Sequence, residues 1–369
     1  MRWLQAIVAS SIIVDKDNLM RNFSPVHIKH LIERKLMGDV TFDQVCDEHI
    51  IIKEPEPYDY PPSIYLPHQL DNIVELHPET FKQAEEDRIH GEKGFHHPIE
   101  AFRIKGVKLR QAGLYKNNWR SYFPHVPGPS KNPVCIEGGS YALASTYSGI
   151  QYFGHWLRDD LTTHLMAKDF ADPFCVRTPD WPDKTTYLDI FDQTWPQADY
   201  GDFDELYFFL DYSQNSHKVE RFNYFREKLR TKIKPKLGGH RVYLRRGDTG
   251  AVKRIISNEA EMIKALEDSG VVIVDITKDP ISEIIQTLLN ARLFITIEGS
   301  QAAHSIYTIG DGGGYLSIVP PCVFNNPAKD WMTALGAKYG FVVGERDGDA
   351  FKVDIPDLLK VADKLEAAL

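Results

Sequence analysis

The second half of the chain alternates regularly between short apolar runs and amphipathic stretches. The apolar runs have the length of strands and predict strands over 241–244, 271–275, 293–297 and 315–319. Helices are predicted between them, over 258–270, from Pro280 onward and after Ser300. Asn258 is expected to cap the first of these helices, with Glu261 completing a capping box. Because strands and helices alternate with mostly short connections, the pattern predicts a parallel, doubly wound sheet.

An amphipathic helix is predicted near the middle of the chain, over 152–167. Its apolar stripe is formed by Trp156, Leu157, Leu161 and Leu165. His155 and Asp159 fall on another face, four residues apart. A strand over 205–210 and a charged helix or connector over 215–236 follow, and we expect a domain boundary within that connector.

The first 130 residues carry weaker patterns. Prolines recur between Pro55 and Pro67 beside mixed charge, which indicates loops around short elements. The apolar run over 3–14 has two interpretations, a short signal peptide or a strand or buried segment. We favour the second, because polar residues interrupt the run and charged residues follow at once. The run is too short to span a bilayer, and no other stretch approaches a transmembrane helix.

Length and composition limit the possible classes of protein. A chain of 369 residues suggests two domains, which we place at 1–220 and 221–369. The hydrophobic content of 43% and charged content of 26% are those of a globular protein with a buried core. A net charge of −9 argues against nucleic-acid binding, which needs clustered, uncompensated Lys and Arg. Widely spaced cysteines are expected to be reduced structural thiols, at Cys46, Cys135, Cys175 and Cys322.

Several familiar signatures are absent from the sequence. There is no P-loop, and the glycine-rich run over 310–314 leads into a strand rather than opening a helix. No zinc-type spacing of His and Glu occurs, so no metal site is predicted. Asp202-Phe203-Asp204 resembles a DxD metal motif. Such motifs normally follow a hydrophobic strand, whereas this one precedes it, so we interpret it as a loop.

Two features follow predicted strands at their carboxyl ends, where ligands bind in open parallel sheets. Arg245 and Arg246 follow one strand, with Arg254 beyond a loop, and paired guanidinium groups suit diphosphate oxygens. Gly299-Ser300 forms a strand-to-helix turn, whose backbone N–H groups can face a phosphate. A solvated basic loop and an ordinary turn are the respective alternatives. Both features at one sheet edge together favour an anion site.

His155 and Asp159 form a third candidate. Their spacing brings both side chains to one helical face, within reach of a hydrogen bond. The carboxylate can fix the tautomer of the imidazole, or can itself be the base. The alternative is an ion pair on the helix surface. The neighbouring Arg158 and Asp160 are expected to pair on the solvent side.

Three segments resemble motifs of glycosyltransferase family 61, in the same order. They are YFGHWLRDDL (152–161), VYLRR followed by RIISNE (242–246 and 254–259), and ARLFITIEGSQAAH (291–304). Together they cover about residues 150–310, and the order of three blocks is more specific than any one of them. The first 130 residues show no such resemblance.

The resemblance implies an α/β fold with two Rossmann-like domains facing a cleft, the GT-B-like architecture. It also implies metal-independent, inverting transfer of a hexosyl or pentosyl group from a nucleotide-sugar, without a cofactor and with a UDP-sugar as the expected donor. His155 and Asp159 would serve the acceptor side. The implied donor-binding residues are Arg245, Arg246, Arg254, Asn258, Glu259, Gly299, Ser300 and His304.

One position departs from the family pattern, because the usual His before Gly299 is Glu298 here. A diphosphate would repel this carboxylate, so Glu298 is expected to contact a ribose or sugar hydroxyl or to act as the base. The catalytic candidates are therefore Asp159, His155 and Glu298, and the identity of the base stays open.

The sequence thus predicts a cytoplasmic glycosyltransferase, with at most peripheral contact at the inner face of the membrane. Its partners would be a nucleotide-sugar and a glycan acceptor, for example in capsule or lipopolysaccharide synthesis. One alternative is a catalytically silent glycan- or nucleotide-binding module of the same fold. Another is a carboxylate-pair glycosidase, for which the separation of Asp159 and Glu298 would be decisive.

Overall fold

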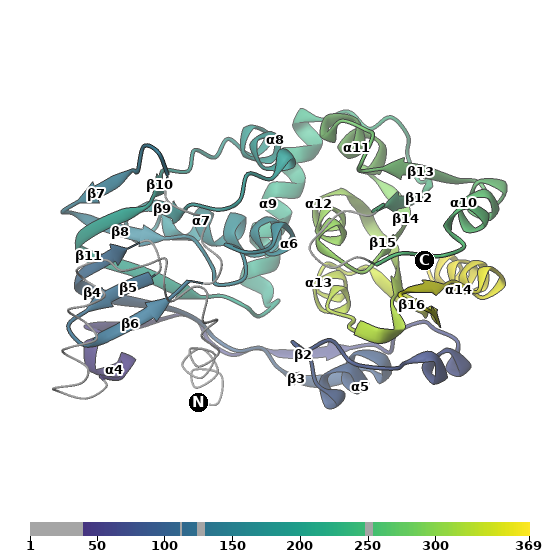
Figure 1. Cartoon of the computed structure of the whole chain (residues 1–369), viewed down its shortest axis with the longest axis horizontal. Coiled ribbons are helices and arrows are strands. Elements are labelled where there is room, and N and C mark those ends of the chain that lie inside the picture. The colour runs from purple at the N-terminus through teal and green to yellow at the C-terminus, as the bar shows by residue number, and fades with distance from the viewer. Residues whose placement is uncertain (1–39, 111–112, 124–129, 248–253) are drawn as a thin grey trace. The chain divides into compact units, whose positions relative to one another are not determined.

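A computed structural model of the chain describes residues 40–110, 113–123, 130–247 and 254–369 (Figure 1). The apolar run over 3–14 lies outside the described residues, so its interpretation stays a prediction. The described residues form a mixed α/β structure and divide into two compact units. Unit 1 holds 40–54, 98–181 and 194–212, and unit 2 holds 55–97, 182–193 and 213–369.

This division differs from a single boundary at residue 220. Two segments from the first half of the chain, 55–97 and 182–193, pack within unit 2. Residue 220 itself lies inside α9 (Ser216–Lys232). Short segments that join a distant sheet carry no periodic pattern of their own, so a sequence pattern does not reveal where they pack.

Unit 1 is built on a mixed sheet, in which nine strands pair among the described residues. Its central strands, β4 (Ile99–Arg110) and β11 (Tyr200–Leu210), run antiparallel. The other antiparallel pairs add β1 (Glu48–Lys53), β5 (Gly113–Lys116) and β6 (Trp119–Tyr122). Parallel pairs add β7 (Cys135–Glu137), β8 (Ser140–Leu143), β9 (Asp172–Val176) and β10 (Gln197–Ala198). The antiparallel half differs from the all-parallel sheet expected of a Rossmann-like domain.

One of these antiparallel pairs, β5 and β6, has a local cause. β5 and β6 are joined by the two-residue turn Asn117-Asn118, and Asn117 adopts a φ of 50°. Asparagine tolerates this left-handed conformation, and so tight a turn forces neighbouring strands to run antiparallel.

The predicted helix over 152–167 is present in unit 1, but it is not uniform. It consists of α6 (Phe153–His155), the π-helical turn η3 (Trp156–Asp160) and α7 (Leu161–Ala167). The predicted apolar stripe is buried at Trp156, Leu157 and Leu161, each with 0% exposure. A short helix, α4 (Phe42–Val45), packs on the sheet through Phe42, whose ring contacts Phe102 of β4.

Unit 2 contains the predicted parallel sheet, with strand order β13-β12-β14-β15-β16. The strands are β12 (Arg241–Arg245), β13 (Val271–Asp275), β14 (Ala291–Ile297), β15 (Ile309–Val319) and β16 (Lys338–Val343). The helices are α10 (Glu259–Asp268), α11 (Ile281–Leu288), α12 (His304–Thr308), α13 (Ala328–Ala334) and α14 (Ile355–Ala367). Helices cover both faces, with α10 and α14 on one face and α12 and α13 on the other (Figure 1). The predicted strands β12 to β15 and the predicted helices α10 to α12 are confirmed, while β16, α13 and α14 were not predicted.

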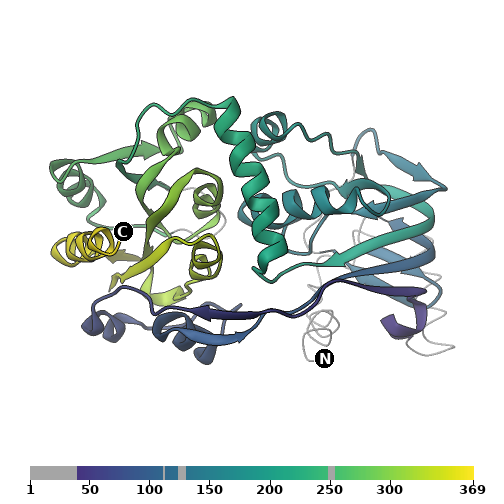
Figure 2. The same cartoon turned by 180° about the vertical axis from the view of Figure 1, so that it is seen from behind.

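The segment 55–97 lies along the edge of this sheet, as Figure 2 also shows in dark blue. Ile64 forms a parallel bridge with Gly340 of β16, and the Tyr65 ring stacks on Phe341 with centroids 5.1 Å apart. Its elements are β2 (Pro57–Tyr60), η2 (Pro67–Asn72), α5 (Lys82–His90) and β3 (Glu92–Phe95). The remaining elements of unit 2 are α8 (Pro182–Phe191), η4 (Ser300–Ala303), η5 (Pro321–Val323), β17 (Glu345–Asp347) and β18 (Ala350–Lys352).

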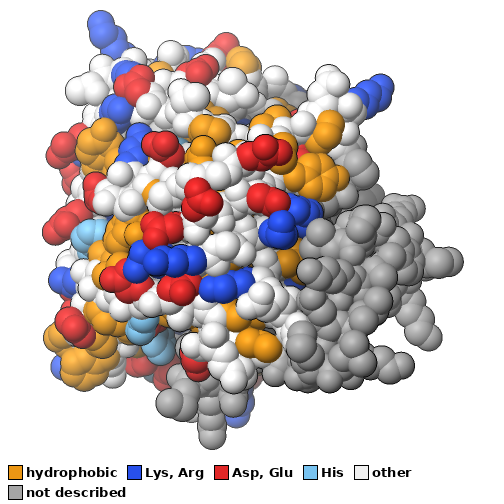
Figure 3. Space-filling model, turned by 90° about the vertical axis from the view of Figure 1, so that its left-hand side faces the viewer, with side chains coloured by type: hydrophobic (Ala, Val, Ile, Leu, Met, Phe, Trp, Pro, Cys, Tyr) orange, Lys and Arg blue, Asp and Glu red, His pale blue; other side chains and the backbone are white. Residues whose placement is uncertain are grey.

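Acidic and basic side chains lie side by side on the face shown in Figure 3. Ion pairs of acidic and basic side chains also lie along β4 and β11. Arg103 contacts Glu48 and Glu205, and Lys108 contacts Asp202. Of the helices in the described residues, none combines the length and apolar character needed to cross a membrane.

Candidate functional site

The carboxyl edge of the unit 2 sheet carries the residues that the sequence placed at strand ends. β12 ends at Arg245 and is followed by Arg246, while β14 ends at Ile297 and is followed by Glu298 and Gly299. β12 and β14 are adjacent parallel strands, so their turns meet at one edge. This is the edge at which open α/β sheets bind ligands.

Arg246 and Arg254 converge on Gly299. A Cβ atom added to Gly299 would lie 2.9 Å from Nη1 of Arg254 and 3.2 Å from Nη1 of Arg246. Glycine leaves room for both guanidinium groups, and its φ of 153° is one that other residues rarely adopt. Burial, and next the charge of Arg254, lowers the pKa of Arg246 to about 10. An anion bound at this turn would stabilise both cations.

Glu298 holds Arg254 in this position. Nη1 of Arg254 lies 2.7 Å from Oε2 of Glu298 and donates to the Glu298 backbone carbonyl at 2.7 Å. Burial raises the pKa of the Glu298 carboxyl, while the charges of Arg254, His77 and Arg246 oppose that rise. The residue that departs from the family pattern therefore forms an ion pair, rather than facing a ligand as an isolated carboxylate.

Arg245 is turned toward two carboxylates of its own unit. Its Nε and Nη2 donate to Glu259 Oε2 at 3.0 and 2.7 Å, and its Nη1 donates to Asp275 Oδ2 at 2.6 Å. Burial acts to raise the pKa of Asp275, but hydrogen bonds from Thr277 and Arg245 lower it to about 2. Arg245 and Glu259 thus tie the end of β12 to α10 and β13.

Asn258 does not form the predicted capping box. Its side-chain amide donates to the Val353 carbonyl at 2.9 Å and accepts from the Val353 N–H at 3.0 Å, and it makes no cap hydrogen bond. Val353 comes from 95 residues further along the chain. The correction has a tertiary cause, because this distant backbone competes with the local N–H groups for the amide.

Ser300 and His304 have different surroundings. Ser300 is exposed and begins η4, a four-residue turn that leads into the five-residue α12. His304 is 1% exposed, with Nδ1 2.6 Å from the Tyr187 hydroxyl and Nε2 3.6 Å from Asp183 Oδ2. Burial lowers the pKa of His304 to about 4, so the imidazole is neutral near pH 7.

His155, Arg158 and Asp159 form a polar cluster in unit 1. Arg158 donates to both carboxylate oxygens of Asp159 at 2.7 to 3.1 Å. Nδ1 of His155 lies 3.1 Å from Asp159 Oδ2 and 2.8 Å from Arg158 Nη2. The Asp159 side chain is 0% exposed, whereas His155 is 31% exposed. The imidazole is therefore partly exposed, whereas the carboxylate is buried.

Arg158 and Asp159 lie on the π-helical turn η3, which His155 directly precedes. The Leu161 N–H donates to the carbonyl of Trp156, five residues earlier. Such turns are frequent at functional sites. The predicted pairing of Arg158 with Asp160 is wrong, because Asp160 is fully buried and accepts from the N–H and hydroxyl of Thr146 at 2.9 and 2.6 Å.

The DxD-like segment lies inside β11, so its interpretation as a loop is wrong. Asp202 pairs with Lys108 at 2.8 Å and Arg110 at 2.7 Å, and Asp204 accepts from the Gly139 N–H at 2.8 Å. Both aspartates thus support the unit 1 sheet. In the described ranges, no group of three or more His, Cys, Asp or Glu side chains is arranged to hold a metal ion.

The loop with Leu76 and His77 also packs at the carboxyl edge of the unit 2 sheet, which the sequence did not predict. Leu76 forms a parallel bridge with Phe324, which follows β15, and the His77 N–H donates to the Phe324 carbonyl at 3.0 Å. The positive charge of a protonated His77 would lower the pKa of Glu298. No sequence motif predicts that this loop lies beside Phe324, because an irregular, proline-rich segment gives no signal for a long-range contact.

Comparisons with known proteins agree with the resemblance seen in the motifs. The family model described as Glycosyltransferase 61 matches residues 153–311. No curated protein sequence matches the chain.

Two solved structures are similar to the chain at low identity. One is the dodecameric iron-containing heptosyltransferase TibC in complex with ADP-D-beta-D-heptose, 12% identical, with a TM-score of 0.33 over 72% of this chain and 82% of that one. The other is the bacterial iron-containing dodecameric glycosyltransferase TibC from enterotoxigenic E. coli H10407, 11% identical, with a TM-score of 0.33 over 81% and 98%. TM-scores this low carry no argument about the fold.

Proposed function

Since residues 153–311 identify the chain as a member of glycosyltransferase family 61, we propose that it transfers a sugar from a nucleotide-sugar to a glycan acceptor. The observation that supports this most is the convergence of Arg246 and Arg254 on Gly299, at the carboxyl edge of a parallel sheet. Two guanidinium groups at one turn suit the oxygens of a diphosphate, which they can bind bidentately.

The proposal divides the predicted donor-binding residues by their contacts. Arg246 and Arg254, with the Gly299-Ser300 turn, bind the diphosphate. Arg245 and Glu259 position the end of β12 through their mutual ion pair. Asn258 and His304 support the site without contacting the diphosphate, since each side chain is hydrogen-bonded within unit 2.

On the acceptor side, we propose His155 as the base and Asp159 as the residue that positions it. Asp159 is fully buried and bound to Arg158, so it can orient the imidazole but cannot touch an acceptor. Nδ1 of His155 lies 3.1 Å from Asp159 Oδ2 and 2.8 Å from Arg158 Nη2, and we propose the tautomer in which Nδ1–H donates to Asp159 and Nε2 takes the acceptor proton. The carboxylate then stabilises the imidazolium that forms when His155 takes a proton.

The reaction is a displacement at the anomeric carbon of the donor. The acceptor oxygen forms a bond to that carbon, while the bond from the carbon to the diphosphate oxygen breaks. The acceptor proton passes to His155, and the electron pair stays on the departing nucleoside diphosphate. Arg246 and Arg254 stabilise the charge that develops there, a role that needs no metal ion.

Several finer parts of this proposal come from the family resemblance rather than from contacts. They are the inverting stereochemistry, the metal independence, the use of a UDP-sugar without a cofactor, and a cytoplasmic role in capsule or lipopolysaccharide synthesis.

An Arg254→Ala variant tests the donor site, with Arg292→Ala as its control. Arg292 is exposed and lies near the start of β14, at the opposite edge of the same sheet. Titration calorimetry with UDP, GDP and ADP should show binding to the wild type and to Arg292→Ala. Arg254→Ala should bind at least tenfold more weakly and lose about 10²–10³ in turnover. The site is misplaced if no nucleotide binds the wild type, or if Arg254→Ala binds as the wild type does.

One observation favours a second candidate function, a silent module that binds nucleotide-sugars. The two candidate carboxylate bases are both ion-paired, Asp159 with Arg158 and Glu298 with Arg254. Incubation with a nucleotide-sugar, with and without glycan acceptors, distinguishes the two functions. A transferase releases nucleoside diphosphate, whereas a silent module binds the donor and leaves it intact.

A further inference from the structure

Backbone hydrogen bonds attach the first part of the loop between η2 and α5 to the carboxyl edge of the unit 2 sheet. The Val74 and Glu75 N–H groups donate to the Pro321 carbonyl at 2.9 and 3.1 Å. The Phe324 N–H donates back to the Glu75 carbonyl at 2.9 Å. Pro321 and Phe324 follow β15, so the loop pairs with the backbone that leaves the sheet at this edge.

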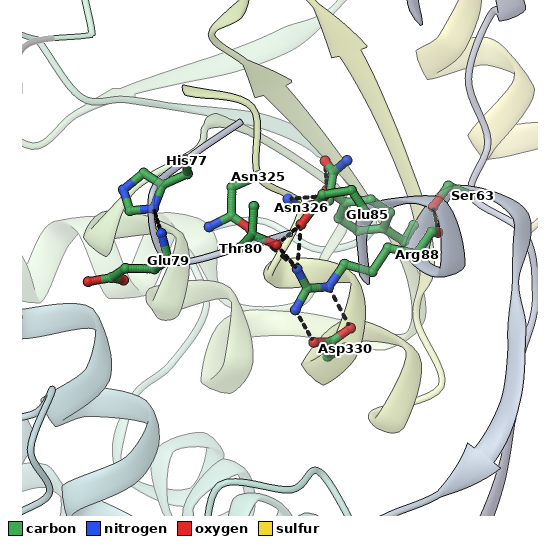
Figure 4. A network of polar contacts seen from close by, with 10 residues as sticks. Ser63, His77, Glu79, Thr80, Glu85, Arg88, Asn325, Asn326 and Asp330 are labelled. Carbon is green, nitrogen blue, oxygen red and sulfur yellow. Dashed lines mark hydrogen bonds and ion pairs between the residues drawn. The ribbon is translucent and has the colours of Figure 1, made fainter. Parts of the chain in front are cut away.

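A buried polar network holds the end of the same loop (Figure 4). Glu85 of α5 is 2% exposed, and it accepts from Arg88 at 2.5 Å and from the Asn326 N–H at 3.0 Å. Arg88 also donates to both carboxylate oxygens of Asp330, at 3.2 and 2.8 Å. Thr80, at the end of the loop, donates to Glu85 at 2.7 Å. With both ends fixed, side chains on the loop have a defined position.

His77 lies in this loop, with its ring on the side away from Arg88 (Figure 4). The Glu79 N–H donates to His77 Nδ1 at 3.2 Å, and this assigns the proton of a neutral imidazole to Nε2. Throughout the described part of the chain, no hydrogen bond is made to Nε2 of His77, and the residue is half-buried. Its Nε2–H is thus oriented by the loop and available to a ligand.

Backbone pairing links the loop with His77 to the strand end that carries Glu298. The His77 N–H is bound to Phe324, shortly after β15, and β15 pairs with β14 at Ile297 and Ile318. The Glu298 N–H continues this pairing by donating to the Ile318 carbonyl at 2.9 Å. The positive charge of a protonated His77 also acts against the raised pKa of Glu298.

We propose that His77 is a further donor-binding residue, whose Nε2–H donates to a phosphate oxygen of the bound nucleoside diphosphate. This inference rests on the proposed function, because it takes the Arg246 and Arg254 turn as the diphosphate site. It gives the upstream segment 55–97 a direct part in ligand binding. The guanidinium groups supply charge, and His77 adds one directed hydrogen bond from the loop between η2 and α5.

Inorganic pyrophosphate is the probe that isolates this contact, because it lacks base and ribose. We would titrate it, and UDP, GDP and ADP, into the wild type, His77→Ala, His77→Gln and the control His90→Gln. His90 ends α5 in the same segment and is exposed. His77→Ala should weaken pyrophosphate binding about tenfold, the effect of one hydrogen bond to a charged group. His77→Gln, whose amide can donate from near the Nε2 position, should recover part of that loss.

Each outcome separates this inference from the proposed function. If the wild type binds neither pyrophosphate nor any of the three nucleotides, the anion site itself is absent and both fail. If Arg254→Ala loses pyrophosphate binding while both His77 variants keep it, only the role of His77 is overturned. If the His77 variants bind the nucleotides more weakly but bind pyrophosphate as the wild type does, His77 contacts the base or ribose, and the phosphate contact is also overturned. Thermal melting shows which variants are folded, and His77→Gln decides the matter if His77→Ala is not.

Discussion

Each unit contains an arginine–carboxylate ion pair beside residues that the sequence singled out, and the two pairs are built differently. In unit 1, Arg158 and Asp159 are adjacent in sequence and share three hydrogen bonds, with the carboxylate fully buried. In unit 2, Arg254 and Glu298 are 44 residues apart and meet through Nη1 of the arginine alone. A second guanidinium group, that of Arg246, lies at the same turn.

The difference indicates two kinds of task. In the first pair the charges of Arg158 and Asp159 compensate each other, and the pair contacts His155, the most exposed member of the cluster. The Arg254–Glu298 pair brings a cation next to a second cation, an arrangement that an anion would stabilise. Chemistry is therefore expected from unit 1 and anion binding from unit 2. Three changes test that division.

Replacing His155 should have the largest effect. His155→Ala is expected to lower kcat about 10²–10⁴-fold, because it removes the proposed base, while the dissociation constant for the nucleotide stays unchanged. Steady-state kinetics and calorimetry on the same preparation measure the two quantities.

His49 offers a matched control for this experiment. It lies on β1 of unit 1, is 47% exposed and also contacts a carboxylate, with Nε2 2.7 Å from Glu100. His49→Ala should turn over normally. Equal losses in both variants, or a loss of nucleotide binding in His155→Ala, would contradict the assignment of chemistry to the unit 1 cluster.

Removing Arg158 should reduce stability rather than ligand binding. Arg158→Ala leaves the buried Asp159 without its cation, which is expected to lower the free energy of unfolding by about 3–5 kcal/mol. Denaturant titration measures this loss. The control is Lys108→Ala, since Lys108 and Asp202 are both nearly half exposed and such pairs contribute about 1 kcal/mol or less. Equal effects in the two variants would show that the Arg158–Asp159 pair is not a supporting element.

Acid should destabilise both units through one buried histidine in each. Burial lowers the pKa of His164 in unit 1 to about 3 and that of His304 in unit 2 to about 4. The unfolded chain takes up these protons near pH 6.5, so between about pH 6.5 and 4 it binds more protons than the folded chain. The free energy of unfolding therefore falls as the pH falls through that window, by about 3 kcal/mol for each histidine.

His164→Phe sharpens this prediction. His164 stacks on Trp195 with ring centroids 4.7 Å apart, a packing that phenylalanine can keep without titrating. Denaturant titrations between pH 7 and 4 should show a shallower loss of stability for His164→Phe than for the wild type. Identical slopes would mean that His164 does not titrate on unfolding in this window.

The strands and helices of unit 2 followed the apolar pattern closely, whereas contacts between distant segments did not. β13 spans the predicted 271–275, because a continuous run of Val and Ile suits a strand buried on both faces. The capping box at Asn258 failed, because Val353 takes the same amide. The strand holding Asp202 starts at Tyr200, earlier than predicted, because ion pairs with β4 make polar positions compatible with a sheet.

The sequence by itself determined the parallel sheet of unit 2, the helix carrying His155 and the family resemblance over residues 150–310. These rest on local periodicity and on ordered motifs, which folding preserves. Only the tertiary structure decided which arginines share the turn at Gly299, that Glu298 binds Arg254, and that the loop with His77 reaches the same edge. Those contacts join residues far apart in the chain, and their geometry depends on packing rather than on spacing.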